Sequence, residues 1–270
     1  ALKHNYLTIK DHIKPSTKIM AVVKSNAYGS DAIQVGQYLE ELGVDSFAVA
    51  YTEEGVALRK AGIHTPILVF YPQSAELEDL VNYELMPSVY DVDLLYHITG
   101  FIQKHNLDSF SFHVNINTGM NRLGFDPADY NAVGKIIKAN TKLKLTGIFS
   151  HFSSPGMEED KGFTEDQIAA FKKAVAFFKP FGTPDFTTHL SNSSGLISYR
   201  EAGMDMIRIG ITLYGYGKNS PDTKLIPIST LKTEIIAGLT SFMTMSYIIV
   251  VNPNILSATG KGFDAILFST

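Results

Sequence analysis

The sequence predicts an α/β protein built as a (β/α)8 TIM barrel. About eight short apolar runs alternate with segments of helical periodicity, a pattern typical of parallel βα units. Residues 1 to about 225 supply nearly the length that such a barrel usually needs, about 250 residues. A doubly wound parallel sheet shows the same alternation, so periodicity alone leaves that architecture open.

The predicted elements follow one another in a regular order. An amphipathic helix opens the chain within residues 1–14, with Leu2, Tyr6, Ile9 and Ile13 at helical spacing, so we expect natural residues upstream of Ala1. Residues 24–30 are predicted to form a loop containing Gly and Asn. The apolar runs predict strands at Ile19–Val23, Phe47–Ala50, Ile67–Phe70, Pro87–Tyr90, Phe110–Ile116, Leu145–His151, Phe186–Leu190 and Met206–Ile211. Helices are predicted at residues 31–42, 53–61, 74–82, 91–105, 127–139, 164–179 and 194–201.

The composition is that of an ordinary globular protein. Apolar residues make up 45% of the chain, charged residues 19%, and the net charge is −4. This weak charge gives no electrostatic reason to expect nucleic acid or an anionic membrane as a partner. The absence of cysteine excludes disulfides, thiolate metal sites and a cysteine nucleophile. It fits a cytoplasmic protein, and residues 1–14 lack the apolar region of a signal peptide.

The last part of the chain differs from the rest. We predict a barrel over residues 1–225 and an atypical apolar tail over residues 226–270. No residue from Ile235 to Gly260 is charged, and Ile235–Val251 is mostly apolar. That length is compatible with a membrane-spanning helix of about 20 residues, and buried strand pairs are the alternative. Membrane contact is expected only if the 235–260 segment forms such a span.

A lysine stands where the first predicted strand ends. Lys24 follows the apolar run Ile19–Val23, and in a barrel this position points the amine toward the mouth, where barrel active sites lie. A lysine amine that is partly desolvated and has cationic neighbours is activated for Schiff-base chemistry. The alternative is a lysine that leaves the strand for solvent.

Two further side chains with possible chemistry follow later strands. Arg122 lies between two glycines in the loop Asn117–Phe125, where it meets either an anionic group or solvent. His151 ends the sixth predicted strand between two phenylalanines. A packed structural histidine is the alternative to a functional one.

The last two predicted strands carry signals for an anion. Residues 191–194 offer hydroxyl and backbone N–H groups at a helix start, and barrels often bind phosphate after strands seven and eight. Arg208 lies inside an apolar strand and therefore needs an acceptor, because an unpaired buried charge is costly. Gly210 lets a backbone N–H approach a ligand. A serine-rich helix cap without a ligand and an edge arginine are the alternatives. With Lys24, Arg122 and His151, this set suits a phosphorylated aldehyde cofactor.

Five motifs, in this order, resemble those of the bacterial alanine racemases. They are V-V-K-S-N-A-Y-G, N-T-G-M-N-R-L-G-F, G-I-F-S-H-F, H-L-S-N-S-S and R-I-G-I-T-L-Y-G, and the similarity spans roughly residues 1–234. The resemblance implies a TIM barrel that binds pyridoxal 5'-phosphate (PLP), followed by a C-terminal β-domain. It also implies a cytoplasmic homodimer that interconverts L-alanine and D-alanine for peptidoglycan synthesis in the cell wall.

The resemblance assigns roles to the residues at matching positions. Lys24 would hold the cofactor as a Schiff base and act as one of two acid/base groups. Arg208 would face the pyridine nitrogen and keep it unprotonated, which favours racemisation over transamination. His151 would help to position Arg208, and Arg122 would approach the phenolic oxygen. The phosphate would bind Tyr28, Ser193 and the backbone around Gly210 and Ile211. The complete set implied to bind the cofactor is Lys24, Tyr28, Arg122, His151, Asn192, Ser193, Arg208, Gly210, Ile211 and Tyr214.

The sequence departs from the family pattern in two places. Asn115 stands where many members have a lysine that can be carbamylated and that braces the arginine, so a bound anion is an alternative support for Arg122. Residues 235–270 instead resemble the first segment of a nucleobase-permease family, which predicts a chimera lacking most or all of the usual C-terminal β-domain. In the family that domain supplies a tyrosine of the partner subunit as the second acid/base group, and no tyrosine of this chain is matched to it.

We therefore expect the barrel to keep PLP chemistry while the racemase activity of this chain itself is reduced. The loss of one of two acid/base groups costs about 10²–10⁴-fold in rate if the group serves only that role. The alternative function is a non-catalytic PLP-binding barrel protein of the cofactor-homeostasis type.

Overall fold

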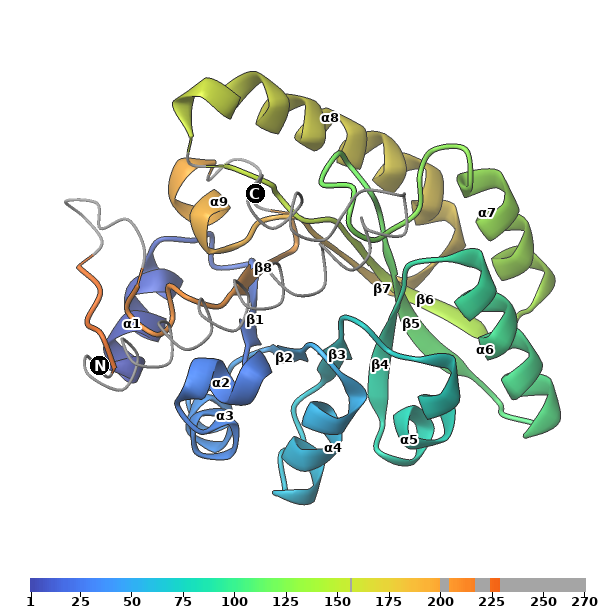
Figure 1. The fold of residues 1–270 in the computed structure, drawn as a ribbon, viewed down its shortest axis with the longest axis horizontal. Helices are drawn as coiled ribbons and strands as arrows, with labels where there is room; N and C mark the ends of the chain where they lie inside the picture. Colours follow the sequence, from blue (N-terminus) through green and yellow to red (C-terminus); the bar gives the residue numbers. More distant parts are fainter. Residues whose placement is uncertain (156, 200–203, 217–223, 229–270) are drawn as a thin grey trace, which may run out of the picture. The chain divides into compact units, whose positions relative to one another are not determined.

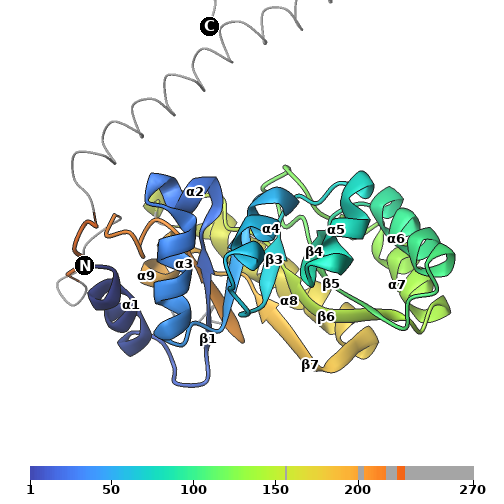
Figure 2. The same ribbon diagram turned by 90° about the horizontal axis from the view of Figure 1, so that it is seen from below.

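The computed structural model describes residues 1–155, 157–199, 204–216 and 224–228. They belong to one compact unit, Ala1–Ile228. Its strands form a single parallel sheet in the order β7-β6-β5-β4-β3-β2-β1-β8. Consecutive strands from β1 to β7 are neighbours and β8 returns to β1, with the helices outside the strands (Figures 1 and 2). This order confirms the (β/α)8 barrel and excludes the doubly wound sheet, in which the strand order reverses.

The strands and helices have the following bounds. The strands are β1 Lys18–Val22, β2 Ser46–Val49, β3 Ile67–Val69, β4 Leu85–Val89, β5 Phe110–Asn115, β6 Leu143–Phe149, β7 Gly182–His189 and β8 Met206–Ile209. The α-helices are α1 Leu2–Asp11, α2 Lys24–Gly29, α3 Ala32–Glu41, α4 Thr52–Lys60, α5 Leu77–Asn82, α6 Val92–Lys104, α7 Tyr130–Ala139, α8 Lys161–Phe178 and α9 Ser193–Ser198. Short 3₁₀ turns are η1 Ser74–Glu76, η2 Glu158–Asp160 and η3 Lys179–Phe181.

Most predicted elements lie within a few residues of the observed ones. The largest difference between a predicted and an observed strand is at β7, which begins at Gly182 and not at Phe186. The amino-terminal half of β7 contains polar residues such as Asp185, which is exposed, so this half gives no apolar run in the sequence. The carboxyl ends of the strands, which matter for a barrel active site, lie within two residues of their predicted positions.

Hydrogen bonds close the seam between β7 and β8. Near the carboxyl ends, the Arg208 backbone N–H donates to the Ser191 carbonyl over 3.0 Å. Just before β8, the Asp205 carboxylate accepts from the Thr188 backbone N–H at 2.9 Å and from its hydroxyl at 2.7 Å, close to the carboxyl end of β7. These bonds connect the first and last strands of the sheet order and so complete the barrel.

Two apolar clusters pack against the strands, one outside the barrel and one inside it. The larger one lies between the strands and the outer helices and includes Phe47, Phe112 and Ile148. The smaller one contains Met20, Leu68 and Phe149 from strands on opposite sides of the sheet order, so these side chains fill the inside of the barrel. A packed interior of this kind is typical of TIM barrels and restricts a ligand to the strand ends.

Residues 24–30 are not the irregular loop predicted from sequence. Ser25, Asn26, Ala27 and Tyr28 all have φ between 52° and 54°, so α2 is a left-handed helical turn. L-residues disfavour this region by about 1–2 kcal/mol each. Hydrogen bonds hold the turn, among them the Ala27 N–H to the Val23 carbonyl at 2.8 Å. The turn directly follows β1 and fixes the direction in which the chain leaves the strand.

The predicted apolar tail lies almost wholly outside the described residues. Among the described residues, no helix is long and apolar enough to cross a membrane. The 235–260 segment, the permease resemblance and the domain boundary at residue 225 remain predictions.

The left-handed turn makes a prediction about stability. Ser25 is exposed and has φ 53°, so Ser25→Gly removes backbone strain without removing packing and should raise the unfolding free energy by about 0.5–1 kcal/mol. Ser30, with φ −103°, is the control: Ser30→Gly only adds freedom to the unfolded chain and should lower stability. Urea unfolding of both variants measures the difference. Equal effects at the two positions would contradict the strained turn.

Candidate active site

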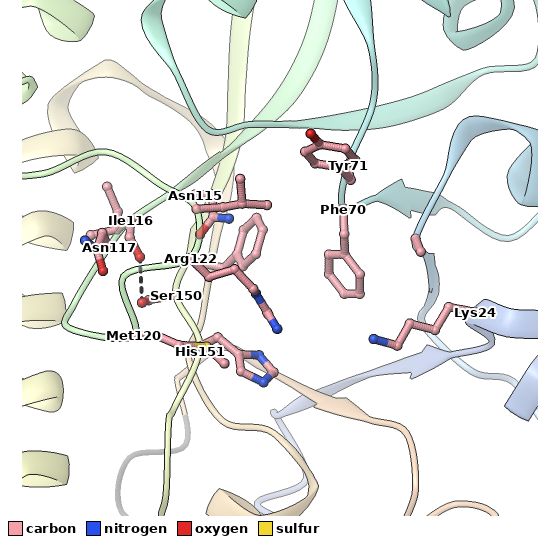
Figure 3. Close-up of a pocket in the computed structure, with 13 residues that line it drawn as sticks. Lys24, Phe70, Tyr71, Asn115, Ile116, Asn117, Met120, Arg122, Ser150 and His151 are labelled. Atoms are coloured by element: carbon pink, nitrogen blue, oxygen red, sulfur yellow. Dashed lines mark hydrogen bonds between the residues drawn. The ribbon is translucent and has the colours of Figure 1, made fainter. Parts of the chain in front are cut away.

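A cavity opens at the carboxyl ends of the strands, where the sequence analysis predicts the functional side chains. Its lining comes from the residues that follow β1, β2, β3, β5 and β6. Figure 3 shows the Lys24 amine and the Arg122 guanidinium directed toward each other across the cavity, with His151 beside them. Phe70 and Tyr71 form an apolar wall above. The structure therefore brings together three of the predicted catalytic residues.

The surroundings of the Lys24 amine favour its neutral form. Burial lowers the pKa of Lys24, the positive charge of Arg122 lowers it further, and Glu54 partly offsets both effects. A neutral amine is the nucleophilic form, so these surroundings favour attack on a carbonyl carbon. Lys24 leads into the left-handed turn, which holds its backbone at the cavity edge.

Arg208 lies behind the cavity, buried inside the barrel. It is only 2% exposed, and burial lowers the pKa of Arg208 to about 9. Its Nη1 donates to the His189 carbonyl at 2.8 Å and to His189 Nδ1 at 2.9 Å. Its Nη2 donates to the carbonyls of Ser150 and Leu190, at 2.6 and 3.3 Å, and lies 3.3 Å from His151 Nδ1. The guanidinium also lies over the Phe149 ring, 5.2 Å from its centroid. Arg208 thus binds neutral acceptors that follow β6 and β7.

Three histidines are kept neutral around this arginine. Burial and the charge of Arg208 lower the pKa of His113 and of His151 to about 3, and lower the pKa of His189 well below its usual value. Because His189 Nδ1 accepts from Arg208, its Nε2 carries the proton and donates to His113 Nδ1 over 2.9 Å. A directed chain of hydrogen bonds therefore runs from Arg208 through His189 to His113.

A second polar group forms where β8 meets the left-handed turn. The Gly210 N–H donates to the Ser193 hydroxyl at 3.1 Å, and the Thr212 N–H approaches the same oxygen at 3.5 Å. A Cβ at Gly210 would overlap the Tyr28 hydroxyl. Hydroxyl and backbone N–H groups thus converge at a position that only glycine leaves open, as an oxyanion or phosphate seat requires.

The other residues predicted to bind the cofactor have more varied surroundings. Asn192 caps α9 by accepting from the Gly195 N–H at 2.9 Å, and its amide lies 3.4 Å from His151 Nε2. Tyr214 is buried behind Tyr28, with ring centroids 4.9 Å apart, and its hydroxyl donates to the Val22 carbonyl. The Ile211 side chain is 48% exposed. Asn115 lines the cavity beside Arg122.

Sequence reasoning missed the part of the site that lies inside the barrel. His113 and His189 were not selected as site residues, although strand alternation carried a signal for one of them. Phe112 and Val114 belong to the outer cluster, so His113 between them faces inward, where a titratable side chain is unusual. Glu54, whose charge acts on Lys24, gave no such signal because it lies on a different βα unit.

The fold and the site define a class of protein: a (β/α)8 barrel whose candidate active site lies at the carboxyl ends of its strands, with a lysine, two arginines and neutral histidines. Residues 1–218 match the family described as "Alanine racemase, N-terminal domain". The chain belongs to this family.

Curated relatives and solved structures agree with this assignment. The chain is 36% identical over 242 residues to an alanine racemase of Thermodesulfovibrio yellowstonii and 37% identical over 243 residues to alanine racemase 2 of Bacillus subtilis. These alignments cover 87% of this chain and 62% and 61% of the relatives. The structure is similar to an alanine racemase of Clostridium difficile, with a TM-score of 0.78, 29% identity and coverage of 84% of this chain and 60% of that chain. The chain thus spans about three fifths of the length of these relatives.

The neutral histidines predict how stability depends on pH. In the unfolded chain the histidines have pKa values near 6.5. In the folded chain the pKa of His113 and of His151 is about 3, so these rings stay neutral as the pH falls from 7 to 5.5. The unfolded state therefore binds more protons below pH 6.5, and stability is lost as the pH falls. The unfolding free energy should drop by about 2–4 kcal/mol between pH 7 and 5.5. Urea unfolding across this range measures it, and a flat profile would show that the histidines are not excluded from protonation.

Proposed function

We propose that this barrel binds PLP through Lys24 and provides the PLP-binding half of an alanine racemase, which interconverts L-alanine and D-alanine. The observation that carries the proposal is the placement of a lysine with a lowered pKa opposite Arg122 in a cavity at the strand ends. The polar group at Ser193 and Gly210, against the left-handed turn that begins at Lys24, offers a seat for a phosphate. Membership of the family and the alanine racemases among its relatives support the proposal.

The residues present fit the cofactor. Ser193, Tyr28 and the Gly210 N–H form the seat for its phosphate, since a side chain at Gly210 would fill that seat. Lys24 supplies the amine for covalent attachment, and Arg122 offers a cation to the phenolic oxygen. Arg208, held by neutral acceptors, would face the pyridine nitrogen.

PLP, when bound, withdraws electrons from the Cα of an attached amino acid and so weakens its C–H bond. The chain's residues direct that chemistry. The Lys24 amine would accept or donate the proton at Cα on one face, and its lowered pKa favours the neutral form, which accepts a proton. Arg208 stays protonated at neutral pH because its pKa, lowered by burial to about 9, still lies above 7. It would therefore donate a hydrogen bond to the pyridine nitrogen of PLP without protonating it, which would favour return of the proton to Cα.

A racemase needs a proton-transfer group on each face of Cα, and Lys24 serves one face. For the other face we propose the tyrosine that the family resemblance places in a C-terminal domain of the partner subunit. This proposal requires a homodimer, and we propose a cytoplasmic location for it. The non-catalytic PLP-binding alternative is less well supported, because the curated relatives reported above are racemases.

The attachment of PLP to Lys24 can be measured directly. After incubation with PLP and reduction with borohydride, peptide mass spectrometry should find a pyridoxyl group on Lys24. Lys24→Ala should abolish the adduct. It should also lower the rate of D-alanine formation by about 10²–10⁴-fold relative to the wild-type chain. The control is Lys18→Ala, which removes an exposed lysine at the opposite end of β1 and should change neither readout. Labelling spread over surface lysines would overturn the assignment.

The phosphate seat has its own test. Gly210→Ala places a Cβ against the Tyr28 hydroxyl, so PLP affinity should fall by about tenfold or more. Binding of pyridoxal, which lacks the phosphate, should change little. Gly100→Ala on α6 is the matched control because a Cβ there meets no atom within 4 Å. Equal losses for PLP and pyridoxal would argue against a phosphate at this position.

A further inference from the structure

Glu54 joins two βα units beside the candidate active site. It lies in the first turn of α4, and its carboxylate divides its two oxygens between two segments. Oε1 accepts from the Ser25 backbone N–H at 2.5 Å. Oε2 accepts from the N–H groups of Ala50 and Tyr51, at 2.7 and 3.2 Å. One side chain thus connects the turn after β1 to the connection between β2 and α4.

An ordinary helix cap accounts for only half of these contacts. A carboxylate in the first turn of a helix commonly accepts from the backbone just before the helix, which explains the bonds from Ala50 and Tyr51. The bond from Ser25 has no role in capping α4. It holds the residue next to Lys24, at the first position of the strained left-handed turn.

Glu54 also opposes the positive charge in the cavity. The charged and titratable groups described around Lys24 are Arg122 after β5, His151 after β6, Tyr71 after β3 and Glu54 on α4. Of these, Arg122 disfavours a protonated Lys24 and Glu54 favours it, whereas His151 is held neutral. The same carboxylate therefore fixes the backbone at Lys24 and moderates its charge.

We propose that Glu54 is a positioning residue for Lys24: its carboxylate holds the Ser25 N–H so that the amine points across the cavity, and its charge offsets that of Arg122. The importance of this arrangement for the cofactor rests on the proposed function. The geometry and the charge effect belong to the chain itself and can be measured without PLP.

The first variant is Glu54→Gln, studied in the full chain without cofactor. A carboxamide has one accepting oxygen, so its NH2 group must face one of the backbone donors and a hydrogen bond is lost. The Ser25 amide should exchange hydrogen about tenfold faster, as expected for the loss of one hydrogen bond. With the negative charge removed, competitive labelling of Lys24 by acetic anhydride, measured by peptide mass spectrometry, should reach its midpoint at a lower pH than in the wild type.

Two further variants separate the tether from the charge. Glu53→Gln removes the same charge from the neighbouring exposed position and should leave both readouts at wild-type values. Glu54→Asp keeps the charge on a shorter side chain that cannot reach both segments. The Ser25 amide should then exchange faster, while the labelling midpoint moves less than in Glu54→Gln.

The outcomes are distinct. The proposal is overturned if Glu54→Gln leaves the Lys24 midpoint unchanged, if Glu53→Gln shifts it equally, or if Ser25 exchange stays at the wild-type rate. Should Glu54→Gln fail to fold, Glu54→Asp decides, because wild-type exchange at Ser25 in that variant would remove the tether. Failure of PLP to attach to Lys24 in the wild type would overturn the proposed function and leave these readouts intact.

Discussion

A single buried cation organises the carboxyl-terminal end of this barrel. Arg208 is almost inaccessible to solvent, and the acceptors described around its guanidinium are carbonyls and imidazole nitrogens that follow β6 and β7. A buried charge without a counter-ion is tolerable only where each donor finds an acceptor. The backbone at Ser150 and His189 is therefore tied to the guanidinium, and the seam beside β8 closes through the backbone of the same residue. His113 and His189 must remain neutral, since a protonated ring next to this cation would repel it.

The features that shape the candidate active site also lower the stability of the folded chain. Neutral buried histidines reduce stability in acid, and a turn with four residues at positive φ disfavours the folded backbone. Both features lie toward the carboxyl ends of the strands, which line or border the cavity. Barrels commonly divide their two ends, with chemistry at the carboxyl ends and stability at the amino ends.

Much of the fold was predictable because its signal is local. Each buried strand end is an apolar run, and residues that terminate such runs, Lys24 and His151, could be identified directly. The contacts that complete the site are not local. Glu54 meets Ser25 only because β1 and β2 pair in the sheet, and His113 meets His189 across 76 positions of sequence. The left-handed backbone of residues 25–28 could not be predicted either, because the sequence S-N-A-Y contains no glycine to indicate positive φ.

The electrostatics of the cavity connect ligand choice to reactivity. Lys24 and Arg122 face each other across it, Arg208 lies behind, and Glu54, which opposes their charge, has both oxygens occupied by backbone N–H groups. A site with this excess of positive charge attracts an anionic ligand. Burial, together with the charge of Arg122, lowers the pKa of Lys24 and so favours the neutral, nucleophilic form of the amine. In the proposed function, this cavity would therefore both attract an anionic carbonyl compound and favour the form of the amine that attacks it.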